Sequence, residues 1–578
     1  MLIQMKRGAL ALFAPIVFAF LTSCKSAPHS SPPPFEEIAK PSGLDFWQSS
    51  GASGDYRLPE IMGSGAALID YDNDGDLDVY LIQGTPEDNG KQLVPPPQGW
   101  KPGNRLFRNE LVPSGKLSFT DVTESAGVGY RGVGMGVAAG DYDNDGFIDL
   151  YVTNFGHNVL YRNKGNGTFQ DVTSSAGVES SGWSTSAAFI DYDKDGLLDL
   201  VVVHYVDFDT RSCFTPTGRR DYCGPKPFQR TVTQVFHNQG NGKFQDVTSA
   251  MGLNAARGPG LGILTGDFDS NGWPDFIVAN DGAANHLWLN QSGQKFQESG
   301  LTSGVAYAAD GHARAGMGVA SGDINGTGQQ SVVVTNLPTE GFTFFQKQGG
   351  GDFMDSTVQM GVFHASTPYT GFGVGLIDIE NRGVLDMFTA NGAVAALTAQ
   401  QNDPYPYRER NMLLRNPGDG KQFEDITAAA GAALEPVEVS RAAVFGDVDN
   451  DGGIDILVTN NNGPIRLLRN IAPERGHWIT LGLQGVRSNR SGYGSVVELI
   501  RKNGSSVSQW VRGDGSYLAA NDGRVHFGLG KSADIDRVQV RWPAGHCEAW
   551  SGVPLDKITT LREGSGQECP ASSGKGKD

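Results

Sequence analysis

Short apolar runs, separated by glycine-rich or acidic turns, recur along most of the chain. GVGMGVAAG (residues 132–140) and DLYVTN (149–154) are typical, and each is rich in small or β-branched residues and shorter than an average helix. NVLYRNKGNGTF (158–169) then places GNG between two further short runs, a pattern typical of a β-hairpin. The pattern therefore predicts a unit of about four strands.

This unit recurs seven times. Its acidic turn is intact in DYDNDGDLD, DYDNDGFID, DYDKDGLLD, DFDSNGWPD and DVDNDGGID, which start at Asp70, Asp141, Asp191, Asp267 and Asp447. Two eroded copies, DINGTGQQS and DIENRGVLD, start at Asp323 and Asp378. Seven four-stranded units predict an all-β fold, a seven-bladed β-propeller over residues 35–470, because radial packing buries faces that one sheet leaves exposed. An open solenoid is the alternative architecture.

The two ends of the array predict how the ring closes. FEEIAKPSGL (35–44) carries the signature of the fourth strand without a repeat before it, and the seventh repeat ends at IRLLRN (465–470) without that strand. We therefore expect the N-terminal strand to complete the last blade.

A different β-rich segment follows the array. Alternation in SVVELI (495–500) and RVQVRW (537–542) indicates strands with one buried face, so residues 471–562 are predicted to form a small, sandwich-like C-terminal domain, followed by a tail over 563–578. From His477 to Thr560 there are ten Lys or Arg and seven Asp or Glu, a local charge of +3. We hypothesise that this domain docks on the acidic propeller, with an ordinary solvated surface as the alternative.

The acidic turns have the donor pattern of a calcium loop. Positions one, three, five and nine of DxDxDGxxD and the backbone carbonyl at seven supply hard oxygen ligands, and Gly at six permits the sharp turn. Ca²⁺ suits such a set better than Mg²⁺ or zinc. We predict about five structural sites, with the candidate ligands Asp70, Asp72, Asp74, Asp78, Asp141, Asp143, Asp145, Asp149, Asp191, Asp193, Asp195, Asp199, Asp267, Asp269, Asn271, Asp275, Asp447, Asp449, Asp451 and Asp455.

An EF-hand shares the opening letters but needs Glu at position twelve and flanking helices. That position is Leu81, Val152, Val202, Val278 and Val458 in the five intact loops, and the flanks read as strands, so EF-hands are excluded. Thr327, Ser331 and Arg382 replace ligands in the eroded copies, for which no metal is expected. A metal-free acidic turn remains the alternative for the intact loops.

The overall charge of −18 disfavours nucleic acid and anionic lipid as partners. Five bound Ca²⁺ would reduce it to −8, which favours a structural role for the ions.

The N-terminus reads as an export signal over residues 1–24, with Lys6 and Arg7 before the apolar run 8–21. LTSC (21–24) resembles a bacterial lipobox, so Cys24 would carry the lipid, and Lys25 suggests an outer-membrane or cell-surface lipoprotein. A plain signal anchor is the alternative. SAPHSSPPP within residues 25–34 is predicted to be a Pro/Ser tether, so membrane contact would occur only through the anchor.

Four further cysteines form two local pairs, Cys213 with Cys223 and Cys547 with Cys569. Two disulfides are the natural interpretation in an exported protein, with a metal site or free thiols as alternatives.

Several motifs of the chain resemble those of known families. The acidic loops and the FxDVTxxAGV spacing resemble the FG-GAP, or VCBS, repeats of integrin-α-type propellers, in which this loop binds calcium. NRSGYGSVVEL, GDGSYLAAN, HFGLG and VRWPAG resemble the ASPIC/UnbV domain, which follows such repeats in the cartilage acidic protein family, and RSCFTPTGRRDYCGP also resembles that group. The resemblance implies a calcium-binding propeller and carries no metal onto the two eroded repeats.

The favoured function is a calcium-binding, surface-tethered module that recognises a protein or glycan, with residues 207–230 as the most distinctive loop. The alternative is a propeller enzyme, a lyase or hydrolase acting on an extracellular polymer, with His312 and Arg314 as polar candidates at the channel. No catalytic constellation is recognisable: GVGYRG (127–132) matches a dinucleotide-binding pattern by letters but precedes a strand instead of a helix. The oligomeric state is left open.

Overall fold

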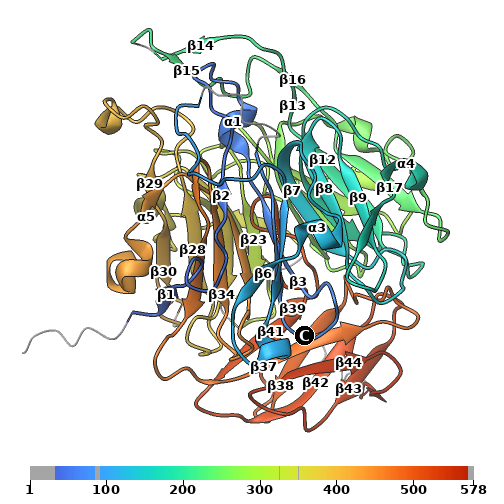
Figure 1. Ribbon diagram of the computed structural model, residues 1–578. Helices are drawn as coiled ribbons and strands as arrows, with labels where there is room; N and C mark the ends of the chain where they lie inside the picture. Colours follow the sequence, from blue (N-terminus) through green and yellow to red (C-terminus); the bar gives the residue numbers. More distant parts are fainter. Residues whose placement is uncertain are drawn as a thin grey trace, which may run out of the picture. The chain divides into compact units, whose positions relative to one another are not determined.

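The computed structural model describes residues 33–84, 92–215, 217–324, 326–348, 351–418 and 420–570. The predicted signal peptide, Cys24 and most of the tether lie outside the described residues. The described chain consists mainly of short β-strands (Figure 1). Its α-helices are short segments between strands: α1 (Pro59–Met62), α2 (Leu111–Ser114), α3 (Thr123–Ala126), α4 (Thr173–Ala176) and α5 (Val362–Ser366).

Each repeat forms one sheet, and seven such sheets lie within the described part of the chain. Sheet 1 contains β3 (Ala66–Ile69), β4 (Asp78–Leu81), β5 (Arg105–Asn109) and β6 (Phe119–Asp121). Sheet 2 contains β7 (Val133–Gly140), β8 (Asp149–Phe155), β9 (Val159–Asn163) and β10 (Phe169–Asp171). Sheet 3 contains β11 (Ser184–Ile190), β12 (Asp199–His204), β17 (Gln234–Asn238) and β18 (Phe244–Asp246). Sheet 4 contains β19 (Gly260–Gly266), β20 (Asp275–Asn280), β21 (His286–Asn290) and β22 (Phe296–Glu298).

The remaining repeats follow the same antiparallel order. Sheet 5 contains β23 (Val319–Gly322), β24 (Ser331–Val334), β25 (Thr343–Lys347) and β26 (Phe353–Asp355). Sheet 6 contains β27 (Gly371–Ile377), β28 (Asp386–Asn391), β30 (Met412–Arg415) and β31 (Glu424–Asp425). Sheet 7 contains β33 (Ser440–Gly446), β34 (Asp455–Asn460), β36 (Arg466–Asn470) and β1 (Phe35–Glu37). The prediction of four strands per repeat is confirmed.

Short ribbons and 3-10 turns connect these sheets. The ribbons are β2 (Trp47–Gln48) with β35 (Gly463–Pro464), β13 (Val206–Asp207) with β16 (Gln229–Arg230), β14 (Cys213–Phe214) with β15 (Arg220–Asp221), and β29 (Glu409–Arg410) with β32 (Val437–Glu438). The 3-10 turns are η1 (Leu253–Ala255), η2 (Thr398–Gln400) and η3 (Thr427–Leu434).

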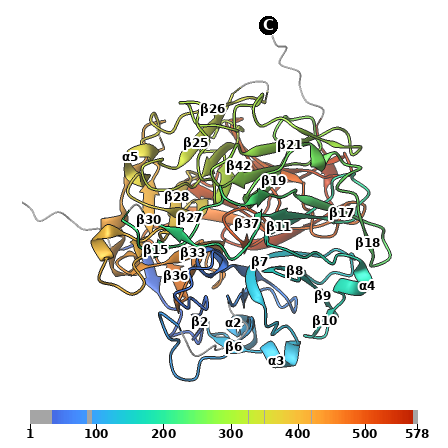
Figure 2. The same cartoon turned by 90° about the horizontal axis from the view of Figure 1, so that it is seen from above.

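The first strands of successive sheets are neighbours around a closed circuit, from β3 through β7, β11, β19, β23 and β27 to β33, which lies beside β3. Figure 2 labels β7, β11, β19, β27 and β33 of this circuit. The N-terminal strand completes sheet 7, because β1 pairs antiparallel with β36 and places Phe35 opposite Asn470. That prediction is confirmed, and the open solenoid is wrong.

Glycines in or next to the first strands allow their backbones to approach closely at the centre of the circuit. A Cβ atom on Gly318 would lie 1.9 Å from the carbonyl oxygen of Phe372 in sheet 6, and one on Gly373 would lie 2.3 Å from the amide nitrogen of Ala443 in sheet 7. The glycine-rich approach to each acidic turn is thus a packing requirement.

The hydrophobic core lies between neighbouring sheets. Ile69 and Tyr80 of sheet 1 pack with Val137 and Val152 of sheet 2, and equivalent clusters fill the other spaces between sheets. Each sheet therefore buries both faces against its two neighbours, an arrangement like that of a β-propeller.

The C-terminal region forms two further sheets. One contains β41 (Val525–Gly530), β37 (His477–Gln484) and β44 (Ile558–Arg562), and the other contains β39 (Ser506–Trp510), β38 (Val496–Arg501), β42 (Ile535–Arg541), β43 (Cys547–Trp550) and β45 (Gln567–Glu568). Both contribute to one hydrophobic cluster, as in a sandwich. Because β45 pairs with β43 and Cys569 bonds to Cys547, the folded region continues past the expected boundary at residue 562.

A segment of the C-terminal region, residues 513–522, enters the centre of the circuit, and we call it the plug. Within it, β40 (Ala519–Ala520) pairs in parallel with β3. Ser516 exchanges backbone hydrogen bonds of 2.7 and 2.9 Å with Val319 and donates its hydroxyl to Ala443 O at 2.6 Å. The plug therefore joins sheets 1, 5 and 7 directly.

Two disulfides are present, Cys213–Cys223 and Cys547–Cys569, with Cα–Cα distances of 5.2 and 5.4 Å. They confirm the predicted pairing and indicate an extracytoplasmic protein. Within the described ranges, no helix has the length and apolar character needed to span a bilayer.

Candidate metal centres and their surroundings

Each acidic turn connects the first two strands of its sheet. In sheet 1, Asp70 accepts hydrogen bonds from the backbone N–H groups of Asp74 and Gly75, both at 3.1 Å. Asn73 and Gly75 adopt left-handed φ angles of 61° and 100°, which close the turn. The backbone thus points the acidic side chains toward one another.

The turns bring carboxylate oxygens within 4.8 Å of one another in several repeats. The acidic groups are Asp70, Asp72 and Asp74; Asp141, Asp143 and Asp149; Asp191, Asp193 and Asp195; and Asp267, Asp269 and Asp275. Asp78, at position nine, has both oxygens engaged, since it accepts from the N–H groups of Tyr71 and Asn109. Position nine therefore also holds the strands together.

Buried carboxylate oxygens without a hydrogen-bond donor occur in all five intact loops. They include Asp72 Oδ1, Asp143 Oδ1, Asp191 Oδ1, Asp267 Oδ1 and Asp449 Oδ1. An unpaired buried carboxylate oxygen is destabilising unless a cation or a donor meets it. The donor set in each intact loop therefore fits a hard divalent cation such as Ca²⁺.

The acid–base properties of these loops lead to the same conclusion. Burial, followed by the neighbouring carboxylates, raises the pKa of Asp70 to about 6 and that of Asp141 to about 7. A bound cation would hold these carboxylates ionised at neutral pH.

In the two eroded loops, donor groups of the protein itself pair with the carboxylates. In sheet 6, Arg382 occupies position five and donates Nη2 to Asp386 Oδ1 at 2.8 Å, so a guanidinium stands where a cation would be needed. In sheet 5, Asp323 accepts from the backbone N–H groups of Thr327 and Gly328 at 3.0 and 2.6 Å. Neither eroded loop has an unpaired buried carboxylate oxygen within the described residues.

Basic side chains on the third strands also approach the loops, and the sequence interpretation missed them. Arg162 pairs with Asp143 and Asp145, and Arg469 lies 3.9 Å from Asp449. His237 Nδ1 lies 3.1 Å from Asp199 Oδ1, and this hydrogen bond raises the pKa of His237. Each precedes an asparagine, so the repeated pair RN or HN is the signal that could have revealed them.

In six of the seven sheets described, an asparagine at the end of the third strand links the sheet to the preceding one. The backbone N–H of Asn163 donates to Asp149 Oδ1 at 2.7 Å, and its Nδ2 donates to Tyr71 O in sheet 1, also at 2.7 Å. Asn109, Asn238, Asn290, Asn416 and Asn470 make the equivalent bond to the preceding sheet in the circuit.

Neighbouring loops are also linked directly. The residue at position four donates its amide to the carbonyl of the glycine at position six of the next loop: Asn381 to Gly452, Asn450 to Gly75, Asn73 to Gly146 and Asn144 to Gly196, at 2.8 to 3.2 Å. Five successive loops thus form one hydrogen-bonded chain.

The C-terminal domain lies against this chain of loops. Arg475 pairs with Asp451 at 2.6 Å, Asn489 Nδ2 donates to Asp191 Oδ2 at 3.3 Å, and the backbone N–H of Arg490 donates to Asn144 Oδ1 at 2.8 Å. The hypothesised docking is observed, and charge contributes to it at Arg475. The plug adds backbone pairing that no charge count indicated.

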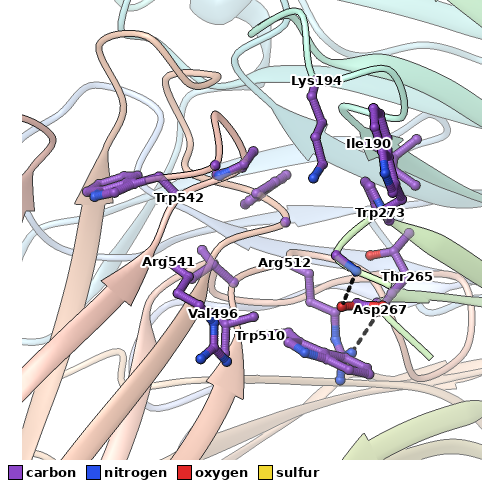
Figure 3. A pocket seen from close by; sticks show the side chains of 18 of the residues that line it. Ile190, Lys194, Thr265, Asp267, Trp273, Val496, Trp510, Arg512, Arg541 and Trp542 are labelled. Carbon is purple, nitrogen blue, oxygen red and sulfur yellow. Dashed lines mark hydrogen bonds between the residues drawn. The ribbon is translucent and has the colours of Figure 1, made fainter. Parts of the chain in front are cut away.

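The C-terminal domain leaves a pocket beside the loop of sheet 4. Ile190, Lys194 and Trp273 line it from the propeller side, and Trp510 and Trp542 line it from the C-terminal domain (Figure 3).

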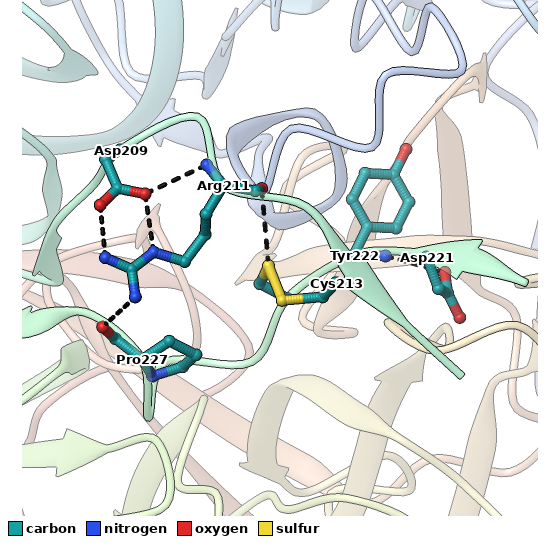
Figure 4. Close-up of a disulfide and its surroundings, with 7 residues drawn as sticks. Asp209, Arg211, Cys213, Asp221, Tyr222 and Pro227 are labelled. Atoms are coloured by element: carbon teal, nitrogen blue, oxygen red, sulfur yellow. Dashed lines mark hydrogen bonds and ion pairs between the residues drawn. A yellow bond between two sulfur atoms is a disulfide. The ribbon is translucent and has the colours of Figure 1, made fainter. Parts of the chain in front are cut away.

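The insertion between β12 and β17 crosses another part of the surface. Its disulfide lies beside Arg211, which donates Nε to Asp209 at 2.7 Å and Nη1 to Pro227 O at 2.6 Å (Figure 4). Asp221 accepts from the Tyr407 hydroxyl at 2.7 Å and from the Ala396 N–H at 2.8 Å. The insertion therefore reaches from sheet 3 to the loop after β28.

The structure does not place His312 and Arg314 in a common channel site. His312 is 77% exposed, and Arg314 pairs with Asp310 at 2.7 Å. Tyr517 and Leu518 of the plug are buried at the centre of the circuit.

The fold and the loops define a class of repeat protein: a closed circuit of four-stranded sheets with acidic turns that could hold Ca²⁺. Consistent with this class, the FG-GAP-like repeat family matches residues 70–152, 141–202, 218–278 and 267–334, and the ASPIC and UnbV family matches residues 485–568. The chain therefore carries both kinds of sequence.

Among curated proteins, the chain is similar to cartilage acidic protein 1 of Mus musculus, with 25% identity over 304 residues, which cover 52% of this chain and 44% of that protein. The Homo sapiens protein is also 25% identical over 304 residues, with 52% and 43% covered. The chain thus spans less than half the length of these relatives.

Two solved structures are similar over large parts of the chain. One is an Agrocybe aegerita lectin described as recognising non-reducing terminal N-acetylglucosamine (TM-score 0.33, 16% identity, 61% of this chain and 76% of that chain). The other is the exotype rhamnogalacturonan lyase YesX (TM-score 0.29, 10% identity, 74% and 91%).

Proposed function

We propose that the protein is an extracytoplasmic, calcium-stabilised seven-bladed β-propeller that binds a protein or glycan ligand. The observation that carries the calcium assignment is the set of unpaired buried carboxylate oxygens in the five intact loops, together with the Arg382 guanidinium in an eroded one. The candidate ligands at positions one and three would hold the ion together with position five or position nine, as grouped in sheets 1 to 4.

The bound ions would also stabilise the contact between the propeller and the C-terminal domain. The loops form a hydrogen-bonded chain, and the C-terminal domain contacts several of them. Calcium would neutralise the carboxylates, fix the turns and so support both the propeller and the domain that lies on it.

We expect ligand binding at exposed surfaces that do not contribute to the hydrophobic core. The disulfide-closed insertion is one, since Phe214 near its tip is 64% exposed. A large exposed aromatic side chain on a rigid loop is a typical recognition element.

We further propose that Cys24 anchors the protein to a bacterial outer membrane or cell surface. The basic and apolar residues before Cys24 support this, as do the disulfides. Mass spectrometry of the membrane fraction tests it: a diacylglycerol adduct on Cys24 is expected, and it should be lost, with release of the protein, in Cys24→Ala. An unmodified Cys24 in the mature protein would contradict the anchor.

The calcium assignment is tested by calorimetry and thermal melting of the mature chain without its lipid. Chelation should lower the melting temperature, and Ca²⁺ at ten times Kd should restore about 1.4 kcal/mol per independent site. Asp143→Ala should remove one of the bound ions. Asp323→Ala, in an eroded loop, is the matched control and should leave the calcium count unchanged. Melting that is indifferent to a chelator would refute the proposal.

A further inference from the structure

The pocket beside the loop of sheet 4 is formed jointly by the propeller and the C-terminal domain and encloses about 230 Å³. Lys194 and Trp273 come from the acidic turns of sheets 3 and 4, whereas Trp510, Arg541 and Trp542 come from strand ends of the C-terminal domain (Figure 3). Pockets that hold whole drug-sized ligands are ~300–1,000 Å³, so this one suits a single ring or the end of a longer molecule.

Three tryptophans line the pocket, and each is held in place. The Trp510 ring packs on Gly266, where a Cβ would lie 2.1 Å from it, and meets Phe268 edge-on at 5.1 Å. Trp542 Nε1 donates to Glu548 Oε2 at 3.0 Å. The Trp273 ring lies 4.4 Å beneath the Lys194 ammonium. Rigid indoles offer flat apolar faces at little entropic cost.

The pocket lining carries more positive than negative groups. Lys194, Arg512 and Arg541 line it, against one carboxylate, Asp267, which belongs to the loop of sheet 4. Arg512 is used internally, since it donates to Thr265 O at 2.8 Å. Within the described part of the chain, neither Lys194 nor Arg541 has an ion-pair partner, whereas His546 Nε2 lies 3.2 Å from Glu563 Oε1. Lys194 and Arg541 are therefore available to an anion.

The backbone around the pocket is already paired. Gly494 N–H donates to Val511 O at 3.0 Å, Val511 N–H donates to Ser495 O at 2.9 Å, and Trp542 N–H donates to His546 O at 3.0 Å. Such a lining does not offer the free strand edge that an extended peptide would extend. Recognition must therefore come from the rings and the cations.

We propose that this pocket binds the terminal unit of an acidic oligosaccharide, with the indoles packing against the sugar ring and Lys194 and Arg541 facing its carboxylate. This inference rests on the proposed binding function and names its ligand class. The Cys547–Cys569 disulfide is next to the turn that carries Trp542 and His546, and so it holds one wall of the pocket.

The test uses the full mature chain with saturating calcium and calorimetric titration of a mannuronic acid trimer. Saturable binding is expected, and the methyl ester of the same trimer should bind at least about ten-fold more weakly, because it lacks the charge. Trp273→Ala and Arg541→Gln should each weaken binding of the acid by about ten-fold. Arg562→Gln, an exposed arginine on β44, is the matched control and should bind as the wild type does.

Several results would overturn the inference. They are equal binding of acid and ester, unchanged affinity in both pocket variants, or binding only of a sulfated trimer or of an oligoglutamate peptide. Chelator-dependent melting is measured on the same samples. A retained melting shift without sugar binding refutes the pocket alone, whereas sugar binding without a melting shift refutes the calcium assignment.

Discussion

At the scale of single residues, the least expected feature is a buried guanidinium. Arg441 on β33 is fully buried, with its guanidinium 4.0 Å from the Phe372 ring. It donates to Ile61 O at 2.7 Å and to Gly392 O at 2.8 Å, so backbone carbonyls take the place of water. Arg441 thereby joins α1 to sheets 6 and 7.

Replacing this residue should be costly. Arg441→Met keeps much of the apolar volume but leaves several buried carbonyl oxygens without donors, so we expect a loss of about 3 kcal/mol in the free energy of unfolding. Urea denaturation measures it. Lys40→Met, which breaks an exposed ion pair with Asp45, is the control and should change stability by less than about 1 kcal/mol. Equal effects of the two changes would contradict the role of Arg441.

A second buried residue should make stability depend on pH. Burial raises the pKa of Glu60 in α1 from 4.5 to about 7, with Arg57, Asp55 and Tyr222 nearby. Because the folded-state pKa is the higher one, the stabilisation is complete below about pH 4.5 and is lost as the pH rises through about 7.

Glu60→Gln should therefore be more stable than the wild type at pH 8, by up to about 3 kcal/mol, with the difference shrinking toward pH 5. Urea denaturation at several pH values in saturating calcium tests this. Glu36→Gln on the exposed β1 position is the control. A difference independent of pH would show that Glu60 is not buried as a neutral acid.

At the scale of elements, the repeat is held together by two kinds of contact. Those within a turn, such as Asp70 with Asp74 and Gly75, determine the local shape. Those from the third-strand asparagines determine the spacing between sheets.

The asparagine contact can be tested at one position. Asn163→Leu removes the donor to Tyr71 O and Ile148 O inside the protein, so we expect a loss of about 2 to 3 kcal/mol and faster hydrogen exchange in sheets 1 and 2. Asn166→Leu, in the exposed hairpin turn of the same sheet, is the control and should leave exchange in sheet 1 unchanged. If only sheet 2 responds, the asparagine does not link the sheets.

The turns and strands could be predicted from the sequence because the contacts that form them lie within one repeat. The candidate calcium ligands could be predicted for the same reason, because those of one site lie in one turn. The link from Asn163 to Tyr71 spans 92 residues, and the one from Tyr517 to Met62 spans 455. Hydrophobic patterning carries no information about such partners, so the asparagine links, the plug and the tryptophan pocket emerged only from the structure.

At the scale of the whole described chain, the plug makes the C-terminal domain part of the propeller core. Tyr517 is fully buried, donates its hydroxyl to Met62 O at 2.8 Å and meets the Phe372 ring at 4.8 Å. The two regions should therefore unfold together.

Tyr517→Ala should reduce the free energy of unfolding by about 3 to 5 kcal/mol, as expected for loss of a large buried side chain. Hydrogen exchange should rise both in β3 of the circuit and in β41 of the C-terminal domain. Tyr307→Ala, at an exposed position, is the control. Faster exchange confined to the C-terminal domain would mean that the circuit is stable without the plug.

The pairing of β1 with β36 and of β40 with β3 has a consequence for biosynthesis. Phe35 emerges from the ribosome more than four hundred residues before its partner Asn470. Ala66 likewise emerges more than four hundred residues before its partner Ala519. A nascent chain therefore carries an unpaired strand at its beginning for most of translation, and its native register can be completed only when nearly the entire polypeptide has been made.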